Sequence, residues 1–83
     1  MTIERAAIRW GGRVWSLPRP ARHHDVIALI HRATGAMGID DVQGFVTSTG
    51  RFVDRKDGAE IALASGQVEA LRWPPNLFSE DLW

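Results

Sequence analysis

Two glycines, Gly11-Gly12, stand between two segments in which apolar and polar residues alternate. Glycine accepts the positive φ angles of a two-residue turn, so the pattern predicts a β-hairpin with strands at residues 3–10 and 13–17. The turn fixes the register, and the register assigns each side chain to a face. The apolar face pairs Trp10 with Arg13, Ile8 with Trp15 and Ala6 with Leu17. The basic face carries Arg5, Ala7, Arg9, Val14 and Ser16.

An amphipathic helix is predicted for residues 21–34, after the segment Pro18-Arg19-Pro20 that ends the hairpin. Pro20 is expected in its first turn, and Gly35 is expected as its C-cap. The helical spacing of the apolar residues then identifies a buried stripe. The stripe consists of Val26, Leu29, Ile30 and Ala33.

A second hairpin is predicted from strands at residues 42–48 and 51–53, with Thr49-Gly50 at or near the turn. In this register one face of the hairpin is occupied by Phe45, Thr47 and Phe52. The loop before it, residues 36–41, contains the neighbouring acids Asp40 and Asp41.

A second helix is predicted for residues 55–65. Asp54 is expected as its N-cap and Gly66 as its C-cap. A narrow stripe of small and apolar side chains suits close packing on a sheet, and it consists of Ala59, Ala62 and Leu63.

The apolar residues of segment 67–83 follow neither the helical nor the strand period, so this segment is expected to form an irregular tail that is aromatic and acidic. We assign the tail to the same single domain, residues 1–83. The element order ββαββα predicts a small α+β fold, with an antiparallel or mixed sheet covered by two helices.

Composition limits where such a chain can work. At 83 residues it holds one core, and it contains no cysteine, which favours a reducing compartment over secretion. The longest apolar stretch, Val26–Ile30, is too short to cross a bilayer, and residues 1–5 show no signal-peptide pattern. We therefore expect a cytoplasmic protein with no membrane partner.

The formal net charge is zero, but the charges are unevenly distributed along the chain. Residues 1–35 carry six arginines against two carboxylates, whereas residues 36–83 carry four basic residues against eight acidic ones. This split predicts either a dipolar surface that orients a charged partner or two halves that pair with each other in the fold.

Histidines are the first candidates for chemistry, and His23, His24, Asp25 and His31 invite a metal site or a general base. On a helix, however, His23 and His24 point about 100° apart, and His24 and His31 lie roughly 10 Å apart along the axis. The acid pairs Asp40-Asp41 and Glu80-Asp81 fall in a loop and in the tail. We expect surface or capping roles for these side chains, with partner contact as the alternative for the histidines, and no catalytic residue, no metal and no cofactor.

The arginines of the first hairpin are the leading candidates for partner binding. Arg5 and Arg9 share a strand face, with Arg13 and Arg19 flanking it. Trp10 and Trp15 are expected in the core. Trp73 and Trp83 either complete the core or anchor a partner, because tryptophan and arginine dominate interface hot spots. The predicted partner-binding residues are thus Arg5, Arg9, Arg13, Arg19, Trp73 and Trp83.

Several strings of the chain resemble a family of small proteins encoded by phages and prophages. These strings are His23–Ile27, Gly44–Ser48, Gly50–Arg55, Ala62–Gln67 and Leu77–Trp83, together 29 of the 83 residues. Within that setting, the small size and the arginine-rich composition resemble anti-CRISPR proteins that act on type I-C Cascade complexes. The resemblance implies a non-enzymatic inhibitor in the host bacterial cytoplasm, with acidic or nucleic-acid-facing surfaces of the complex as the partner of the arginine face.

The hypothesis from sequence is therefore a phage- or prophage-encoded inhibitor that binds a bacterial defence complex and blocks its binding of target DNA. The alternative is a small nucleic-acid-binding accessory protein that uses the same arginines. The zero net charge argues against a general nucleic-acid binder and against mimicry of DNA.

Overall fold

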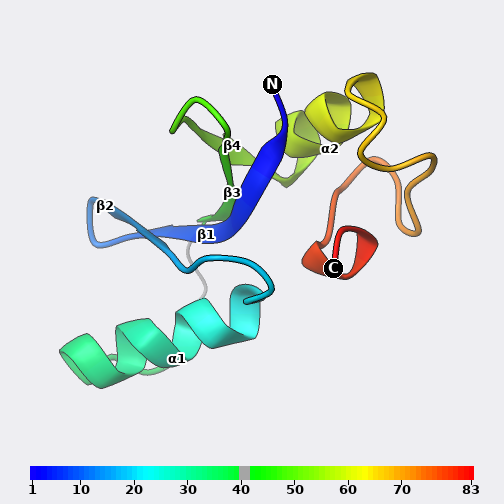
Figure 1. Ribbon diagram of the computed structural model, residues 1–83. Helices are drawn as coiled ribbons and strands as arrows, with labels where there is room; N and C mark the ends of the chain where they lie inside the picture. Colours follow the sequence, from blue (N-terminus) through cyan, green and yellow to red (C-terminus); the bar gives the residue numbers. More distant parts are fainter. Residues whose placement is uncertain (40–41) are drawn as a thin grey trace.

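The computed structural model describes residues 1–39 and 42–83 and shows one four-stranded antiparallel sheet with two helices (Figure 1). The strand order is β2-β1-β3-β4, which confirms the predicted ββαββα order and the α+β class. The predicted acid pair Asp40-Asp41 lies outside the described residues. The elements are β1 (Ile3–Trp10), β2 (Arg13–Ser16), α1 (His23–Thr34), β3 (Val42–Thr47), β4 (Phe52–Asp54), α2 (Arg55–Ala64) and a short 3₁₀ turn (Ser79–Asp81).

The first hairpin has the predicted register. Trp10 pairs with Arg13 and Ile8 with Trp15, around two glycines with φ values of 60° and 75°. The predicted pair of Ala6 with Leu17 does not form, because β2 ends at Ser16 and the chain then turns toward α1.

Strand β1 lies in the middle of the sheet and pairs with both β2 and β3. A bulge between Ile3 and Arg5 shifts its register by one residue against β3. The bulge brings Ile3 onto the face of Ala6 and Ile8, and all three side chains are fully buried there.

The second hairpin differs from its prediction by one residue. A register that placed Phe52 on the face of Phe45 and Thr47 would be shifted by one residue from the observed one, in which Val46 pairs with Phe52 and Phe45 pairs with Val53. The loop has three residues, 48–50, so Thr49-Gly50 lies at the turn as predicted. It ends at Gly50 with a φ of 83°, the residue that such loops place in the left-handed region. The shift of one residue moves Phe52 to the opposite face, so the prediction that it shares a face with Phe45 was wrong.

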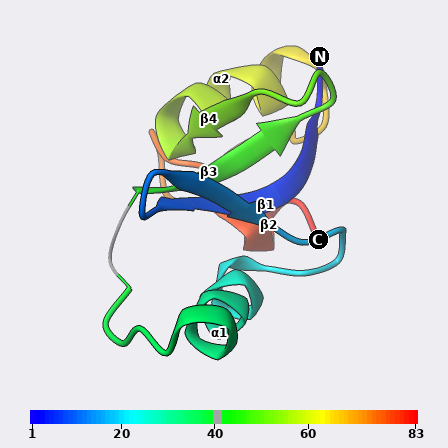
Figure 2. The same ribbon diagram turned by 90° about the vertical axis from the view of Figure 1, so that its left-hand side faces the viewer.

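Helix α1 begins at His23, two residues later than predicted, and Pro20 lies outside it. The backbone N–H of Arg22 donates to the Asp25 carboxylate at 2.8 Å, which sets the start of the helix. Its core-facing residues are His23, Val26 and Ile30; Leu29 is only half-buried and Ala33 is exposed. The predicted stripe was therefore partly wrong, because the last turn extends beyond the sheet (Figures 1 and 2).

Helix α2 begins at the predicted N-cap, where the Asp54 carboxylate accepts the backbone N–H of Asp57 at 2.8 Å. It buries Gly58, Ala59 and Ala62, whereas Leu63 is exposed, contrary to the prediction. A Cβ at Gly58 would stand 3.1 Å from the Phe45 ring, so the helix approaches the sheet closely.

Both helices pack on one face of the twisted sheet. α1 covers Ile8 at the end formed by β1 and β2, and α2 covers Phe45 and Val53 on β3 and β4. The tail completes the second cluster with Val68 and Leu77, which are buried. The opposite face of the sheet carries neither helix (Figure 2).

We predict that Gly44→Ala lowers the free energy of unfolding by about 3 kcal/mol or more. A Cβ at Gly44 would stand 2.1 Å from the backbone oxygen of Val53, and the paired strands cannot separate without losing their hydrogen bonds. Urea denaturation measures the effect. Gly35→Ala is the control, because Gly35 has a positive φ of 75° but no atom within 4 Å of the added Cβ. A smaller loss in Gly44→Ala than in the control would contradict the predicted clash.

Candidate functional site

The outer face of the sheet, defined here by Arg5, Arg9, Val14, Val42 and Phe52, is the candidate binding surface. The register directs Arg5 and Arg9 of β1 to this face, and both are exposed. Among residues 1–39 and 42–83, neither arginine makes an ion pair. Their guanidinium groups are therefore accessible to an external oxyanion.

The Phe52 ring is half-buried and lies close to Gly44 of the neighbouring strand. A Cβ at Gly44 would be 2.9 Å from the ring atom Cζ, so the absence of a side chain at Gly44 makes room for the ring. The guanidinium carbon of Arg9 lies over this ring, 5.2 Å from its centre. An arginine stacked on an aromatic ring loses little further freedom when it binds a carboxylate or a phosphate.

Exposed valines adjoin the arginines on the outer face. Val14 of β2 and Val42 of β3 both pair with Arg9 and are 46% and 39% exposed. The surface thus combines cationic and apolar groups rather than cationic groups alone.

The structure does not bring Arg13 and Arg19 into this surface. Arg13 lies on the other face of the hairpin, with its guanidinium 4.7 Å from the Trp15 ring centre. Arg19 donates to Glu4 at 3.2 Å and lies 5.6 Å from the Trp83 ring centre. Sequence reasoning missed Phe52, whose assignment depends on the loop length of the second hairpin.

The two C-terminal tryptophans have different environments. The indole N–H of Trp83 donates to the carbonyl of Ala21 at 2.9 Å, and its backbone oxygen accepts hydrogen bonds from the Arg22 guanidinium. Trp83 therefore helps fasten the tail to the start of α1. Trp73 is 52% exposed and contacts Phe78 edge-to-face at 5.1 Å.

His23 is buried, contrary to the expected surface or capping role, with 7% of its surface exposed. Its Nε2 donates to the Gly44 carbonyl at 2.7 Å, its Nδ1 faces Arg55 at 3.5 Å, and its ring packs edge-to-face on Phe45. Burial, aided by the positive charge of Arg55, lowers the pKa of His23 from 6.5 to about 4. The imidazole is therefore neutral at pH 7, and both of its nitrogens face partners within the protein.

Arg55 occupies the centre of this polar cluster. It donates to the backbone oxygen of Leu77 at 2.9 Å and to the side chain of Gln43 at 2.5 Å, and its guanidinium lies 4.3 Å from the Phe78 ring centre. The cluster joins α1, β3, α2 and the tail, so we interpret its role as structural.

The remaining candidates for chemistry are dispersed. His24 lies 3.4 Å from Asp25, and both side chains are exposed. Within the described part of the chain, no three histidine or acidic side chains come together as a metal site. None of the described helices has the length and apolarity needed to cross a membrane.

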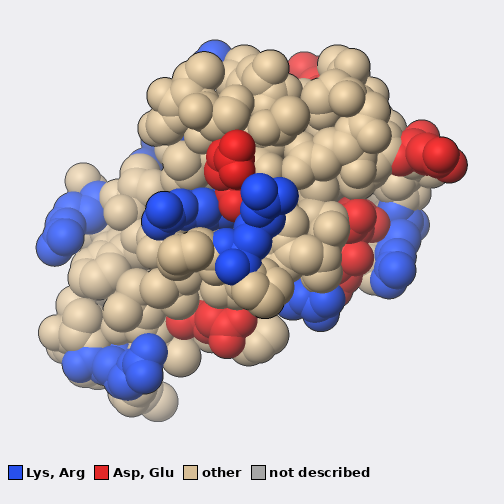
Figure 3. Space-filling view, in the orientation of Figure 1, with Lys and Arg blue, Asp and Glu red and all other residues tan. Residues whose placement is uncertain are grey.

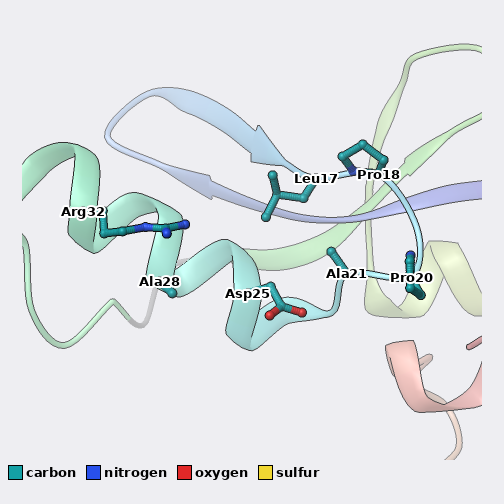
Figure 4. Close-up of a pocket in the computed structure, with 7 residues that line it drawn as sticks. All are labelled: Leu17, Pro18, Pro20, Ala21, Asp25, Ala28 and Arg32. Atoms are coloured by element: carbon teal, nitrogen blue, oxygen red, sulfur yellow. The ribbon is translucent and has the colours of Figure 1, made fainter.

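An open groove of about 580 Å³ lies between α1 and the β2–α1 connection (Figure 4). Leu17, Pro18 and Ala28 give it apolar walls, and the Arg32 side chain extends along the helix beside it. The Asp25 carboxylate accepts the backbone N–H of Arg22 and so caps the start of α1. The groove offers packing for an apolar group but no pair of reactive side chains.

The face shown in Figure 3 is not divided into a basic half and an acidic half. Figure 3 shows separate basic groups with acidic groups between them on the face in view. The ion pairs found among the described residues join Arg19 to Glu4, His24 to Asp25 and Arg72 to Asp81, each within one half of the sequence. Neither predicted arrangement, a dipole or pairing of the halves, is favoured by these contacts.

We predict that His23 makes the protein less stable as the pH falls. Below pH 6.5 the unfolded chain binds a proton at His23 that the folded chain accepts only near pH 4. Between pH 7 and 5 this linkage removes about 2 kcal/mol of the free energy of unfolding. Denaturant titrations of the native protein and of His23→Gln isolate this contribution, because the variant lacks the imidazole. Equal pH slopes in the two proteins would contradict the buried, neutral state of His23.

Comparison with known proteins identifies the family of the chain. A family model described as Phage T4 y16D protein matches residues 2–83, so the chain belongs to this family. The match confirms the predicted setting of a small phage protein but carries no statement about CRISPR-Cas complexes or nucleic acid. No curated protein matches the chain. No solved structure matches it either.

Proposed function

We propose that this member of the Phage T4 y16D family is a non-catalytic inhibitor that docks through its outer sheet face on an acidic surface of a bacterial defence complex. Type I-C Cascade is the specific target proposed, and target DNA binding is the step that would be blocked. The family match supports the phage setting. The choice of Cascade rests on the resemblance to anti-CRISPR proteins described above.

The observation that carries the proposal is the combination of Arg5, the Arg9–Phe52 stack and the exposed valines on the sheet face opposite α1 and α2. Arginine and aromatic side chains are enriched at protein interfaces, and preordered arginines are frequent hot spots. Valines beside the arginines supply apolar area that excludes water from the contact. This composition suits a protein surface that carries carboxylates.

A non-catalytic role is supported by the state of the candidate reactive groups. His23 is neutral, buried and hydrogen-bonded on the protein side, and the His24–Asp25 pair is open to solvent. A general base requires a nitrogen that can reach a substrate proton, which the geometry of His23 does not offer.

Nucleic-acid binding is the second candidate function, because an open sheet with arginines and a phenylalanine can also meet phosphates and bases. The outer face presents two arginines among valines, and the chain has a net charge of zero and a pI near 6.8. Binding to a phosphate backbone depends on the number of cations that replace its counterions. Protein binding is therefore the better-supported function.

We predict that the protein associates with purified type I-C Cascade and reduces its binding of target DNA. The double variant Arg5→Glu/Arg9→Glu should weaken the association by about 30-fold or more, because both cations of the outer face then repel an acidic surface. Pull-down and fluorescence anisotropy with labelled target DNA measure the two effects.

Arg51→Glu/Lys56→Glu is the matched control, since it makes the same change in charge at two exposed residues of the β3–β4 loop and the first turn of α2. The control should stay within about 3-fold of the native protein. No association with Cascade and undiminished DNA binding would reject the target. A salt-dependent gel shift with free DNA or RNA would favour the second candidate function instead.

A further inference from the structure

Trp73 projects from a tight turn on the helix-bearing side of the sheet. The backbone N–H of Asn76 donates to the Trp73 oxygen at 3.1 Å, and two prolines, Pro74 and Pro75, fill the turn. The Leu77 side chain that follows is fully buried, which attaches the turn to the core. A large aromatic side chain that is half exposed and held by a rigid turn has little entropy to lose on binding.

The indole of Trp73 forms one wall of a pocket of about 410 Å³. Phe78 forms a second wall, with its ring inclined at 72° to the indole. The guanidinium of Arg55 lies over Phe78 and donates to Leu77 and Gln43, which holds this wall in place. The other residues that line the pocket are Pro74, Asn76 and Glu80.

Glu80 adds a negative charge to this aromatic pocket. Glu80 is exposed, and its Oε1 accepts a hydrogen bond from the Ser79 hydroxyl at 3.1 Å. In residues 1–39 and 42–83 the Glu80 carboxylate makes no ion pair within 4 Å, although it lies close enough to Arg55 and His23 to interact electrostatically with both. A carboxylate and an indole that line the same pocket are complementary to a cation, whereas the carboxylate repels phosphate.

We infer that the pocket of Trp73, Phe78 and Glu80 receives a cationic side chain, arginine or lysine, from a protein partner. The indole face attracts the cation and packs on its alkyl chain, and Glu80 accepts its N–H groups. This contact is separate from the outer face, which lies on the other side of the sheet and attracts acidic groups. The inference does not depend on Cascade being the partner.

The test uses the full chain and two short probes, acetyl-Gly-Arg-Gly-amide and the same peptide with citrulline, which is neutral and nearly isosteric with arginine. The indole N–H resonance of Trp73 is followed by NMR and assigned by its absence in Trp73→Phe. The arginine peptide should shift this resonance saturably and bind at least about 3-fold more tightly than the citrulline peptide. Glu80→Gln should weaken binding of the arginine peptide by about 2- to 5-fold.

Glu69→Gln is the matched control, because Glu69 is an exposed acid that does not line the pocket. It should leave the affinity for the arginine peptide unchanged. Equal affinity for the two peptides, or native affinity in Glu80→Gln, would overturn the inference. Preference of the pocket for a triproline peptide or a mononucleotide would overturn it as well. The Cascade assay does not bear on these outcomes, because neither its test variant at Arg5 and Arg9 nor its control at Arg51 and Lys56 changes a residue that lines the pocket.

Discussion

The arrangement of the molecule depends on the hydrogen bonds of a single half-buried guanidinium, that of Arg55. It donates to the backbone of the tail at Leu77, to β3 at Gln43, and faces His23 at the start of α1. A small domain has little apolar area with which to hold α1, β3, α2 and the tail together. These contacts lie on the same face of the sheet as the two apolar clusters, on which both helices and the tail pack. The opposite face is left without a helix and carries the Arg9–Phe52 stack.

Local chemistry made much of this fold predictable. The register of the first hairpin follows from Gly11-Gly12, and the start of α2 follows from Asp54, because both depend on residues within a few positions. The second hairpin shows the limit of such reasoning. Its loop could contain two or three residues, and only the pairing of β3 with β4 decides between them. This difference of one residue in loop length determines which face of the sheet carries Phe52.

The candidate site was predictable to a similar degree. The alternation of residues along β1 correctly predicted that Arg5 and Arg9 share a face. Arg13 and Arg19 lie outside that surface, because Arg13 points to the other face of the hairpin and Arg19 binds Glu4. The burial of His23 had no local signal, since its partners Gly44 and Arg55 lie 21 and 32 residues away. A glycine in the third position of a possible three-residue loop, Gly50, was the one signal that could have revealed Phe52.

The proposed inhibitor would use two surfaces of opposite chemistry, with arginines on one side of the sheet and an acidic aromatic pocket on the other. Arginine-specific dicarbonyl footprinting, with and without type I-C Cascade, tests the central claim most directly, because it measures the accessibility of each guanidinium. The account predicts that modification of Arg5 and Arg9 slows several-fold in the complex while that of Arg32 and Arg51 does not change. Unchanged modification of Arg5 and Arg9 in a formed complex would contradict binding through the outer face.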